Sequence, residues 1–400
     1  MENTNVLISG ASIAGPALAY WLRRHGFNPT VVERAPAPRP GGHAVDLRGV
    51  AREVVERMGL MAEVRRDSVD ERGVHFVDER GRPVVSMPAH LFEGEGMVAE
   101  IEILRGDLTR ILYEATRDTT EYLFDDCVTG LTPDDGGVKV TFERRASRTF
   151  DLVVGADGAH SGVRALAFGS RDESAFVRHL GAYTAYFTTS RPADLDGWFL
   201  MHNAPGGRVA AIRPDRSPAQ AKAMFSFASE PIRYDRRDVD QQKRILADRF
   251  AGMGWQVPRL LDEMWDAPDF YFDAICQVHL DHWSRGRTVL LGDAAFCSSP
   301  LSGLGTSLAL VAAYVLAGEL AVAGGDHRIA FARYESELRD YVKQCQRLPP
   351  GGVRGYLPRT RAALWLRNHS MRAMTSRPMR ALAAREMRRA DAITLKNYPD

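Results

Sequence analysis

The sequence predicts a protein of the α/β class with two lobes, one built on a parallel sheet and one on a mostly antiparallel sheet, followed by a helical C-terminus. Three observations predict this fold class. An apolar strand enters a glycine-bearing turn and then a helix at GASIAG (residues 10–15). Two more apolar strands end in GADG (155–158) and GDAAF (292–296). The stretch 176–274 is rich in aromatic residues and has no turn of the first kind, which favours a separate sheet.

Length and composition exclude several classes of protein. A chain of 400 residues is too long for one ordinary domain and fits two packed lobes. The 52 Lys and Arg residues nearly balance the 51 Asp and Glu residues, so the sequence indicates no nucleic-acid partner. The four cysteines form no CxxC pair and the histidines show no HxxxH or HExxH spacing, so we expect no disulfide framework and no metal site.

The composition also predicts a cytoplasmic location. The N-terminal MENTNV lacks the basic start and apolar stretch of a secretory signal. The longest apolar run, 307–324, is interrupted by Glu319, so we expect a buried core helix and no stable membrane insertion.

Ten arginines fall within 351–400, and we expect a solvated helix face there, with a partner or membrane surface as the alternative.

The first element pair is a strand, a tight turn, a helix and a second strand over residues 5–33. Gly10 permits the turn, Gly15 lets the helix pack closely on the strand, and the free N–H groups of the helix can bind a pyrophosphate. Glu33 ends the second strand, where a carboxylate can bind both ribose hydroxyls and so favours FAD or NAD over NADP. The motif is Rossmann-like, although taken alone it could be an ordinary strand-turn-helix corner.

Ser12 stands where this turn normally has its middle glycine. We expect its hydroxyl to donate to a phosphate oxygen. A short-chain dehydrogenase is excluded, because Ala14 and Pro16 occupy its glycine positions and no Tyr is followed four residues later by Lys.

The later elements place two more polar turns at strand ends. A hairpin is expected over 74–88 and a helix over 104–115. Asp157 would lie at the carboxyl end of a strand, where open α/β sheets bind ligands. Asp293 follows another strand and can accept a hydrogen bond from a polyol. The helix that opens at GLGTS (303–307) can stabilise negative charge on a ring.

In order and spacing, these three turns resemble the GxGxxG, DG and GD motifs of the flavin-dependent aromatic hydroxylases, the family of para-hydroxybenzoate hydroxylase, over most of the chain. The resemblance implies a Rossmann-like FAD-binding domain, with the ribityl chain near Asp293. Arg105 is similar to the family arginine at the flavin pyrophosphate, and VDLRG (45–49) is similar to the segment beside the isoalloxazine. The residues expected at the cofactor are Gly10, Ser12, Ile13, Ala14, Gly15, Glu33, Arg34, Asp46, Arg48, Arg105, Val128, Asp157, Gly158, Gly292, Asp293, Pro300, Gly303, Leu304, Gly305 and Thr306.

The resemblance implies an FAD-dependent monooxygenase. NADPH or NADH would reduce FAD, O2 would add at flavin C4a, and the C4a-hydroperoxyflavin would hydroxylate an aromatic or polycyclic small molecule without a side-chain nucleophile. Pro300 and Gly305 would line the flavin. Relatives of this kind look like polyketide-tailoring or tetracycline-inactivating monooxygenases. A flavin reductase or dehydrogenase without oxygen transfer, and a non-enzymatic flavin-binding sensor, stay open as alternatives.

The sequence departs from the family pattern at Phe296, Ser307 and Ala312, which remove polar groups near the ring. We leave open whether they alter flavin motion or specificity. The aromatic second lobe suggests a flat, multi-ring substrate held by apolar contact. Core packing is the alternative for each candidate substrate residue, and these are Tyr183, Tyr186, Trp198, His202, Arg213, Phe225 and Phe227.

The expected domain boundaries follow these motifs, and the protein is expected to be a monomer or homodimer. The FAD-binding domain takes three segments, the substrate domain two, and the helical C-terminus one. In chain order these are 1–72 (FAD), 73–97 (substrate hairpin), 98–175 (FAD), 176–274 (substrate), 275–348 (FAD) and 349–400 (C-terminal).

Overall fold

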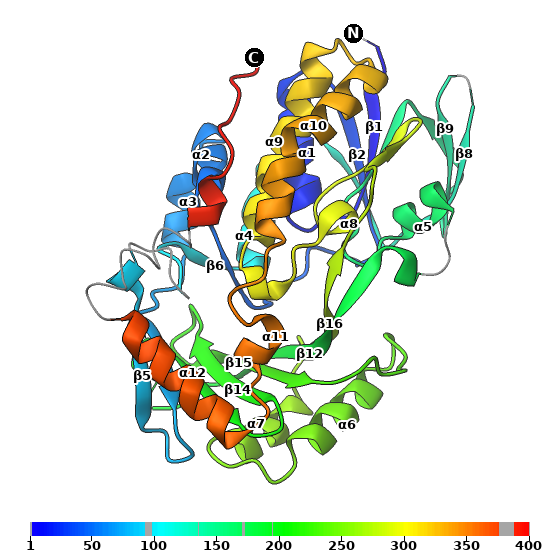
Figure 1. Cartoon of the computed structure of the whole chain (residues 1–400). Helices are drawn as coiled ribbons and strands as arrows, with labels where there is room; N and C mark the ends of the chain where they lie inside the picture. Colours follow the sequence, from blue (N-terminus) through cyan, green and yellow to red (C-terminus); the bar gives the residue numbers. More distant parts are fainter. Residues whose placement is uncertain are drawn as a thin grey trace.

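The computed structural model describes residues 2–92, 98–134, 136–169, 173–193, 195–375 and 388–399. Two lobes lie one above the other in Figure 1, and both ends of the chain lie in the upper lobe. We call the upper lobe, which carries the three glycine-bearing turns, the first lobe, and the lower one the second lobe.

A six-stranded sheet forms the centre of the first lobe. Its strands, in order across the sheet, are β17 (Ser284–Arg285), β18 (Thr288–Leu290), β11 (Leu152–Gly155), β1 (Asn5–Ser9), β2 (Asn28–Glu33) and β7 (Glu121–Phe124). All neighbours pair in parallel except β17 with β18. Nearly every residue of β1 and β11 is buried, as expected for parallel strands covered on both faces.

Helices and a small antiparallel sheet complete the core of the first lobe. Helix α9 (Gly305–Val322) packs against both α1 (Ala14–Arg24) and α10 (His327–Cys345). It is long and apolar enough to cross a membrane, but 83% of it is buried inside the protein, which confirms the predicted core helix. The remaining elements are β3 (Ala44–Asp46), α2 (Val50–Arg57), α3 (Met61–Arg66), β6 (Glu102–Leu104), α4 (Arg105–Glu114), β8 (Val128–Pro133), β9 (Val138–Phe142), β10 (Arg148–Phe150), α5 (Gly162–Phe168) and α8 (Asp293–Phe296).

The second lobe is a seven-stranded sheet with two helices on one face. In order across the sheet its strands are β16 (Tyr271–Val278), β12 (Val177–Ser190), β15 (Gln220–Ala228), β14 (Arg208–Pro214), β13 (Trp198–Ala204), β4 (Gly73–Val77) and β5 (Pro83–Pro88). The pairing is antiparallel except between β13 and β4. The hairpin expected over 74–88 is confirmed as β4 and β5, and it belongs to this sheet.

The two faces of this sheet have different neighbours, because side chains alternate along each strand. One face packs in a core with α6 (Val239–Phe250) and α7 (Val257–Met264). The other face looks toward the first lobe, where the ring of Tyr186 stacks on the ring of His43 from the first lobe at 4.4 Å between centroids. We call this contact region between the lobes the lobe junction.

This alternation corrects the expected placement of five candidate substrate residues. Tyr183, Phe225 and Phe227 belong to the core under α6 and α7, and Trp198 packs against that core. The side chain of His202 is buried, and its Nδ1 lies 3.1 Å from the Val77 carbonyl oxygen. Their side chains occupy the face away from the first lobe, because the junction face takes the alternate positions of the same strands.

The C-terminal segment follows both lobes. Helices α11 (Gly352–Tyr356) and α12 (Arg361–Met374) lie along the second lobe, with α12 beside β5 (Figure 1). The described residues 388–399 lie against the first lobe, where the Tyr314 hydroxyl donates to the Lys396 carbonyl at 2.7 Å. Arg377, Arg380 and Arg385, which contribute to the predicted basic tail, lie outside the described residues.

Candidate functional site

The first turn is closed by contacts that only glycine permits. Gly10 has a φ of +110°, and a Cβ there would lie 2.4 Å from the Ala156 carbonyl oxygen at the end of β11. A Cβ on Gly15 would lie 1.9 Å from the carbonyl oxygen of Gly10. Among the described residues no side chain caps the N-terminus of α1 at Ile13. The first turn of α1 therefore presents N–H groups that an anion can bind.

The carboxylate of Glu33 is held in place beside this turn. The backbone N–H of Ala11 donates to Glu33 Oε2 at 2.8 Å, and the N–H of Ala35 donates to Oε1 at 2.9 Å. Oε1 also accepts from Arg39 Nη2 at 3.4 Å, so Oε2 is the oxygen that keeps a lone pair for a ligand hydroxyl. The N–H of Asp126 donates to the Glu33 carbonyl at 3.1 Å, which brings the chain just before Val128 to the same strand end.

Arg105 places a positive charge at the same turn. Its Nη2 donates to Ser12 Oγ at 2.9 Å. As the first residue of α4, it is held by its own N–H, which donates to the His43 carbonyl at 3.0 Å. Because Ser12 Oγ accepts from Arg105, the hydroxyl proton of Ser12 can be donated elsewhere. A guanidinium, a hydroxyl and a helix N-terminus thus meet at one point, which suits a phosphate or pyrophosphate.

The third turn meets the first one. Gly292 has a φ of +63°, and a Cβ there would lie 3.3 Å from the Cβ of Ala14. Asp293 follows at the start of α8 and lies near Gly305, where α9 begins. Burial raises the pKa of Asp293, whereas the charge of Arg105 opposes this rise. The carboxylate therefore lies between the first turn and the N-terminus of α9.

Asp46 and Arg48 also lie against the start of α9. Arg48 Nε donates to Asp46 Oδ2 at 2.8 Å, and a Cβ on Gly303 would lie 3.0 Å from the same oxygen. The Arg48 N–H donates to Ser307 Oγ at 3.1 Å, and the Ser307 hydroxyl lies 3.2 Å from the Arg48 carbonyl. Ser307, one of the departures from the family pattern, therefore fixes the Asp46–Arg48 segment onto α9.

The other two departures are core residues in this structure. Phe296 is buried and its ring lies 4.7 Å from that of Trp283. Ala312 is fully buried within α9. Neither side chain reaches solvent, and both pack in the hydrophobic core of the first lobe.

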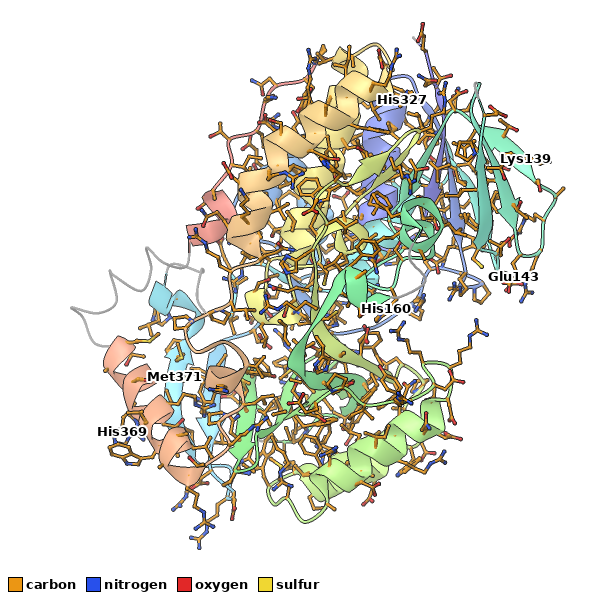
Figure 2. All side chains as sticks on the ribbon, turned by 45° about the vertical axis from the view of Figure 1, so that its right-hand side comes forward. Lys139, Glu143, His160, His327, His369 and Met371 are labelled. Carbon is orange, nitrogen blue, oxygen red and sulfur yellow. The ribbon has the colours of Figure 1, made fainter. Side chains whose placement is uncertain are left out.

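The second turn orders the chain at the carboxyl end of β11. Asp157 Oδ2 accepts from the Val163 N–H at 3.1 Å and its other oxygen accepts from the Ser161 hydroxyl, so this carboxylate holds the start of α5. Gly158 has a φ of +86° and no described atom would lie within 4 Å of a Cβ there. His160, two residues later, lies near the level where the two lobes meet (Figure 2). Its Nε2 lies 3.0 Å from Oδ2 of Asp273 in β16.

The junction face of the second sheet brings aromatic groups to this site. Tyr271 lies opposite Tyr186 in the β12–β16 pairing, with 6.3 Å between ring centroids. Burial and the charge of Asp273 raise the pKa of Tyr271, and the charge of Arg105 opposes this. Tyr271 is nonetheless 44% exposed.

Arg213 also occupies the junction face, but other protein groups hold its guanidinium. Its Nε donates to Glu71 Oε1 at 3.0 Å, and Nη2 donates to both Glu71 and Glu102. The guanidinium carbon lies 4.8 Å from the centre of the Phe199 ring. Arg213 therefore ties β14 to β6 and to the segment before β4.

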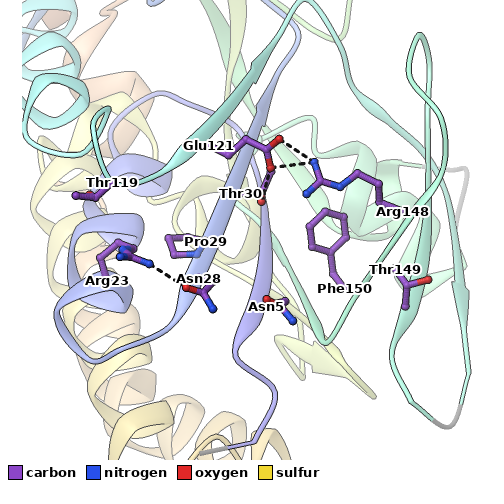
Figure 3. Close-up of a pocket in the computed structure, with 10 residues that line it drawn as sticks. All are labelled: Asn5, Arg23, Asn28, Pro29, Thr30, Thr119, Glu121, Arg148, Thr149 and Phe150. Carbon is purple, nitrogen blue, oxygen red and sulfur yellow. Dashed lines mark hydrogen bonds and ion pairs between the residues drawn. The ribbon is translucent and has the colours of Figure 1, made fainter.

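A separate pocket lies far from these groups. It has a volume of about 330 Å³ and is lined by residues that include Asn5, Asn28, Glu121 and Arg148 (Figure 3). Asn5, Asn28 and Glu121 begin β1, β2 and β7, so the pocket lies at the amino ends of the parallel strands. Ligands of open α/β sheets bind at the carboxyl ends. The glycine-bearing turns, and not this pocket, therefore form the candidate site.

Comparison with known proteins decides the family. A family model described as FAD binding domain matches residues 3–348. The chain belongs to this family. A flavin-dependent monooxygenase of Legionella longbeachae serogroup 1 (strain NSW150) is 40% identical over 348 residues, covering 86% of this chain and 88% of that protein.

Two further likenesses agree. An uncharacterized protein of Mycobacterium tuberculosis (strain ATCC 25618 / H37Rv) is 46% identical over 357 residues, covering 88% of this chain and 94% of that protein. The crystal structure of tetracycline destructase Tet(55) is 37% identical with a TM-score of 0.82, and the match covers 100% of both chains. The protein is thus a member of the FAD-dependent monooxygenases, as the three turns of its sequence indicate.

The residues of the candidate site fit FAD. The close contacts of Gly10 and Gly15 hold the turn before α1, no described side chain caps the N-terminus of that helix, and Arg105 adds a positive charge there. Glu33 suits an adenosine ribose, and Asp293 lies where a polyol chain can donate to it. Among the described residues there is no group of three or more His, Cys, Asp or Glu side chains able to hold a metal ion.

Sequence patterns missed the junction groups of both lobes. His43 lies in a loop rich in proline and glycine. Tyr271 and Asp273 are neighbours in β16, but His160 is more than one hundred residues away from them in the sequence. One indication was usable, the alternation of side chains along a strand. Because Tyr271 pairs directly with Tyr186 on the neighbouring strand, the two side chains lie on the same face of the sheet.

Proposed function

We propose that this protein uses NADPH or NADH and O2 to hydroxylate an aromatic or polycyclic small molecule at the lobe junction, with bound FAD. One observation carries the proposal, a chain of contacts from the cofactor site to the aromatic face of the second sheet. The N–H of Arg105 donates to the His43 carbonyl, the His43 ring stacks on Tyr186, and the Tyr186 ring lies 6.3 Å from that of Tyr271. An aromatic surface next to a redox cofactor suits a flat substrate.

The chain's own residues have positioning tasks in this proposal. Gly10, Ser12, Glu33 and Arg105 would bind the ADP half of FAD, and Asp293 would bind the ribityl chain. When bound, FAD supplies electron transfer from the nicotinamide and activation of O2. The N–H groups at the start of α9, among them those of Gly305 and Thr306, would stabilise negative charge on the ring, and Pro300 would line its edge.

The junction would hold the substrate and keep water away from the reacting atoms. The faces of Tyr186 and His43 already stack on each other, so this part of the site is preformed. The similarity to tetracycline destructases supports a polycyclic substrate, as does the flat aromatic surface. Arg34 and Val128 would complete the adenosine side.

Oxygen labelling tests the proposal directly. The purified protein is expected to show a flavin absorbance spectrum and to oxidise NADPH or NADH faster when a substrate from a panel of polycyclic phenols and tetracyclines is added. With ¹⁸O2, mass spectrometry is expected to find one labelled oxygen atom in the product. Substrate-stimulated oxidation without incorporated label would instead identify a flavin reductase, and a protein that cannot be reconstituted with FAD would contradict the proposal altogether.

A further inference from the structure

Three polar side chains form a hydrogen-bonded row across the lobe junction. The Tyr271 hydroxyl donates to Asp273 Oδ2 at 3.0 Å. His160 Nε2 lies 3.0 Å from Asp273 Oδ2 and 3.1 Å from Oδ1. Tyr271 and Asp273 come from β16 in the second sheet, whereas His160 follows the second glycine-bearing turn in the first lobe, so the row joins the two lobes.

The members of the row differ in exposure. The side chain of Asp273 is 14% exposed and that of His160 24%, whereas Tyr271 is 44% exposed. Asp273 and His160 are therefore mostly enclosed by protein, and Tyr271 is the member of the row that solvent or a ligand can reach. A ligand at the junction can reach Tyr271 but has little access to Asp273.

Asp273 accepts hydrogen bonds and donates none when it is ionised. Burial opposes its ionisation, but the hydrogen bond and charge of His160 and the N–H of Ala274 hold the pKa of this carboxyl below its ordinary value. The Ala274 N–H donates to Oδ1 at 2.7 Å. The carboxylate thus fixes the direction of the bond from Tyr271.

The direction of that bond decides what Tyr271 can offer a ligand. A phenol has one proton and two lone pairs. Because the proton points at Asp273, the oxygen of Tyr271 presents lone pairs to the junction. A ligand that reaches this oxygen gains a hydrogen bond only if it carries a donor.

We propose that Tyr271 is a specificity-determining residue that selects ring compounds carrying an O–H or N–H donor, and that Asp273 and His160 are the positioning residues that orient its hydroxyl. The inference rests on the proposed function only in taking the ligand to be the substrate. Tyr186 lies next to Tyr271 on the same face, so a ring that contacts Tyr186 can extend its edge to the Tyr271 oxygen.

A matched pair of ligands tests the donor requirement. We would measure the affinity of the FAD-loaded protein for 2-naphthol and for its methyl ether, 2-methoxynaphthalene, by equilibrium dialysis at pH 7. The wild-type protein is expected to prefer 2-naphthol by about tenfold, the effect of one hydrogen bond to a partly buried neutral group. Tyr271→Phe is expected to bring the preference below twofold.

Tyr113→Phe is the control, because it removes a phenol hydroxyl from α4 of the first lobe, away from β16. It is expected to keep the wild-type preference. A wild-type preference below twofold, or a full preference in Tyr271→Phe, would overturn the proposal.

A second set of variants tests the positioning residues. His160→Gln keeps an N–H donor for Asp273 and is expected to retain the preference, whereas His160→Leu removes the donor and is expected to reduce it at least threefold. Asp273→Asn places an amide N–H within reach of the Tyr271 oxygen, which turns the hydroxyl proton toward the ligand, so the preference is expected to vanish. Flavin content and circular dichroism report whether each variant folds. An unchanged preference in folded His160→Leu and Asp273→Asn would overturn the orienting role.

The two proposals fail in distinguishable ways. Donor preference without ¹⁸O incorporation would contradict the monooxygenase reaction and leave the role of Tyr271 intact. Incorporation of label with equal affinity for the two naphthalenes would contradict the role of Tyr271 alone.

Discussion

His43 lies among three cationic side chains at the lobe junction. Burial, together with the charges of Arg105, Arg213 and Lys222, lowers the pKa of its ring to about 3. In the unfolded chain the pKa of histidine is about 6.5, so between these values the unfolded state binds a proton that the folded state excludes. The contribution of His43 to stability is therefore complete above pH 6.5 and is lost as the pH falls toward 3.

His43→Phe isolates this effect, because phenylalanine keeps a ring against Tyr186 and cannot bind a proton. Between pH 7 and pH 5 the free energy of unfolding of the wild-type protein is expected to fall by about 2 kcal/mol more than that of the variant. Urea titrations at the two pH values measure the difference. Equal falls in the two proteins would show that the ring is not shielded from protons.

Asp293 is the second residue with a measurable consequence. Removing its carboxylate in Asp293→Ala is expected to weaken FAD binding about tenfold or more, because a hydrogen bond to a charged acceptor is lost, while the fold persists. Fluorescence titration of the apoprotein with FAD measures the affinity, and urea unfolding measures stability. Asp248→Ala, on the exposed face of α6, is the matched control and is expected to bind FAD normally. Unchanged FAD affinity in Asp293→Ala would remove this residue from the site.

At the scale of elements, the strand-turn-helix unit of β1 and α1 depends on close backbone approach. Gly10 combines a positive φ with direct contact to the end of β11. Gly59 also has a positive φ, of +73°, but no described atom would lie within 4 Å of a Cβ there. A substitution at Gly59 therefore adds backbone strain alone, whereas a substitution at Gly10 adds backbone strain and a steric clash.

Gly10→Ala is expected to destabilise the protein by about 2–4 kcal/mol, because strain and overpacking act together. Gly59→Ala is expected to cost about 1–2 kcal/mol, from backbone conformation alone. Urea unfolding of both variants gives the comparison. If the two variants lost the same stability, the turn would not be constrained by its contact with Ala156.

At the scale of the whole molecule, the C-terminal segment completes the core of the first lobe. Glu319 is 2% exposed within the apolar helix α9, and it accepts from Lys396 Nζ and from the Tyr398 hydroxyl, each at 2.9 Å. The Tyr398 ring fills the space beside Gly318, where a Cβ would lie 2.2 Å from it. Two residues of the C-terminal segment thus donate to a carboxylate that is buried in α9.

Removing both donors in Lys396→Ala/Tyr398→Phe is expected to destabilise the protein by about 2 kcal/mol, because a buried carboxylate loses its partners. The value is modest because Lys396 is half exposed and water can replace part of its effect. Adding Glu319→Gln to the double variant is expected to restore part of the loss. Urea unfolding measures all three proteins, and a double variant as stable as wild type would show that the segment contributes no charge pairing.

The sequence predicted the elements whose determinants are local. The three turns, Glu33 and Asp293 follow from short strand-turn-helix patterns in which glycine and a carboxylate have defined positions. The orientation of the second sheet could not be predicted, because both faces of β12 carry apolar or aromatic residues, and Tyr183 and Tyr186 look equivalent in sequence. The contacts of His43 with Tyr186 and of His160 with Asp273 depend on packing between distant segments, which no local pattern encodes.

Side chains alternate between the two faces of the second sheet, so the residues that form the core and the residues that face the junction occupy different positions along each strand. Positions such as Tyr183 and Phe225 build the helix-covered core, while their neighbours Tyr186 and Met224 belong to the opposite face. A mutant library confined to the alternate positions of β12, β15 and β16 on the junction face would therefore vary ligand contacts while sparing the core under α6 and α7. If the proposed function holds, such a library would show which junction positions set the range of substrates.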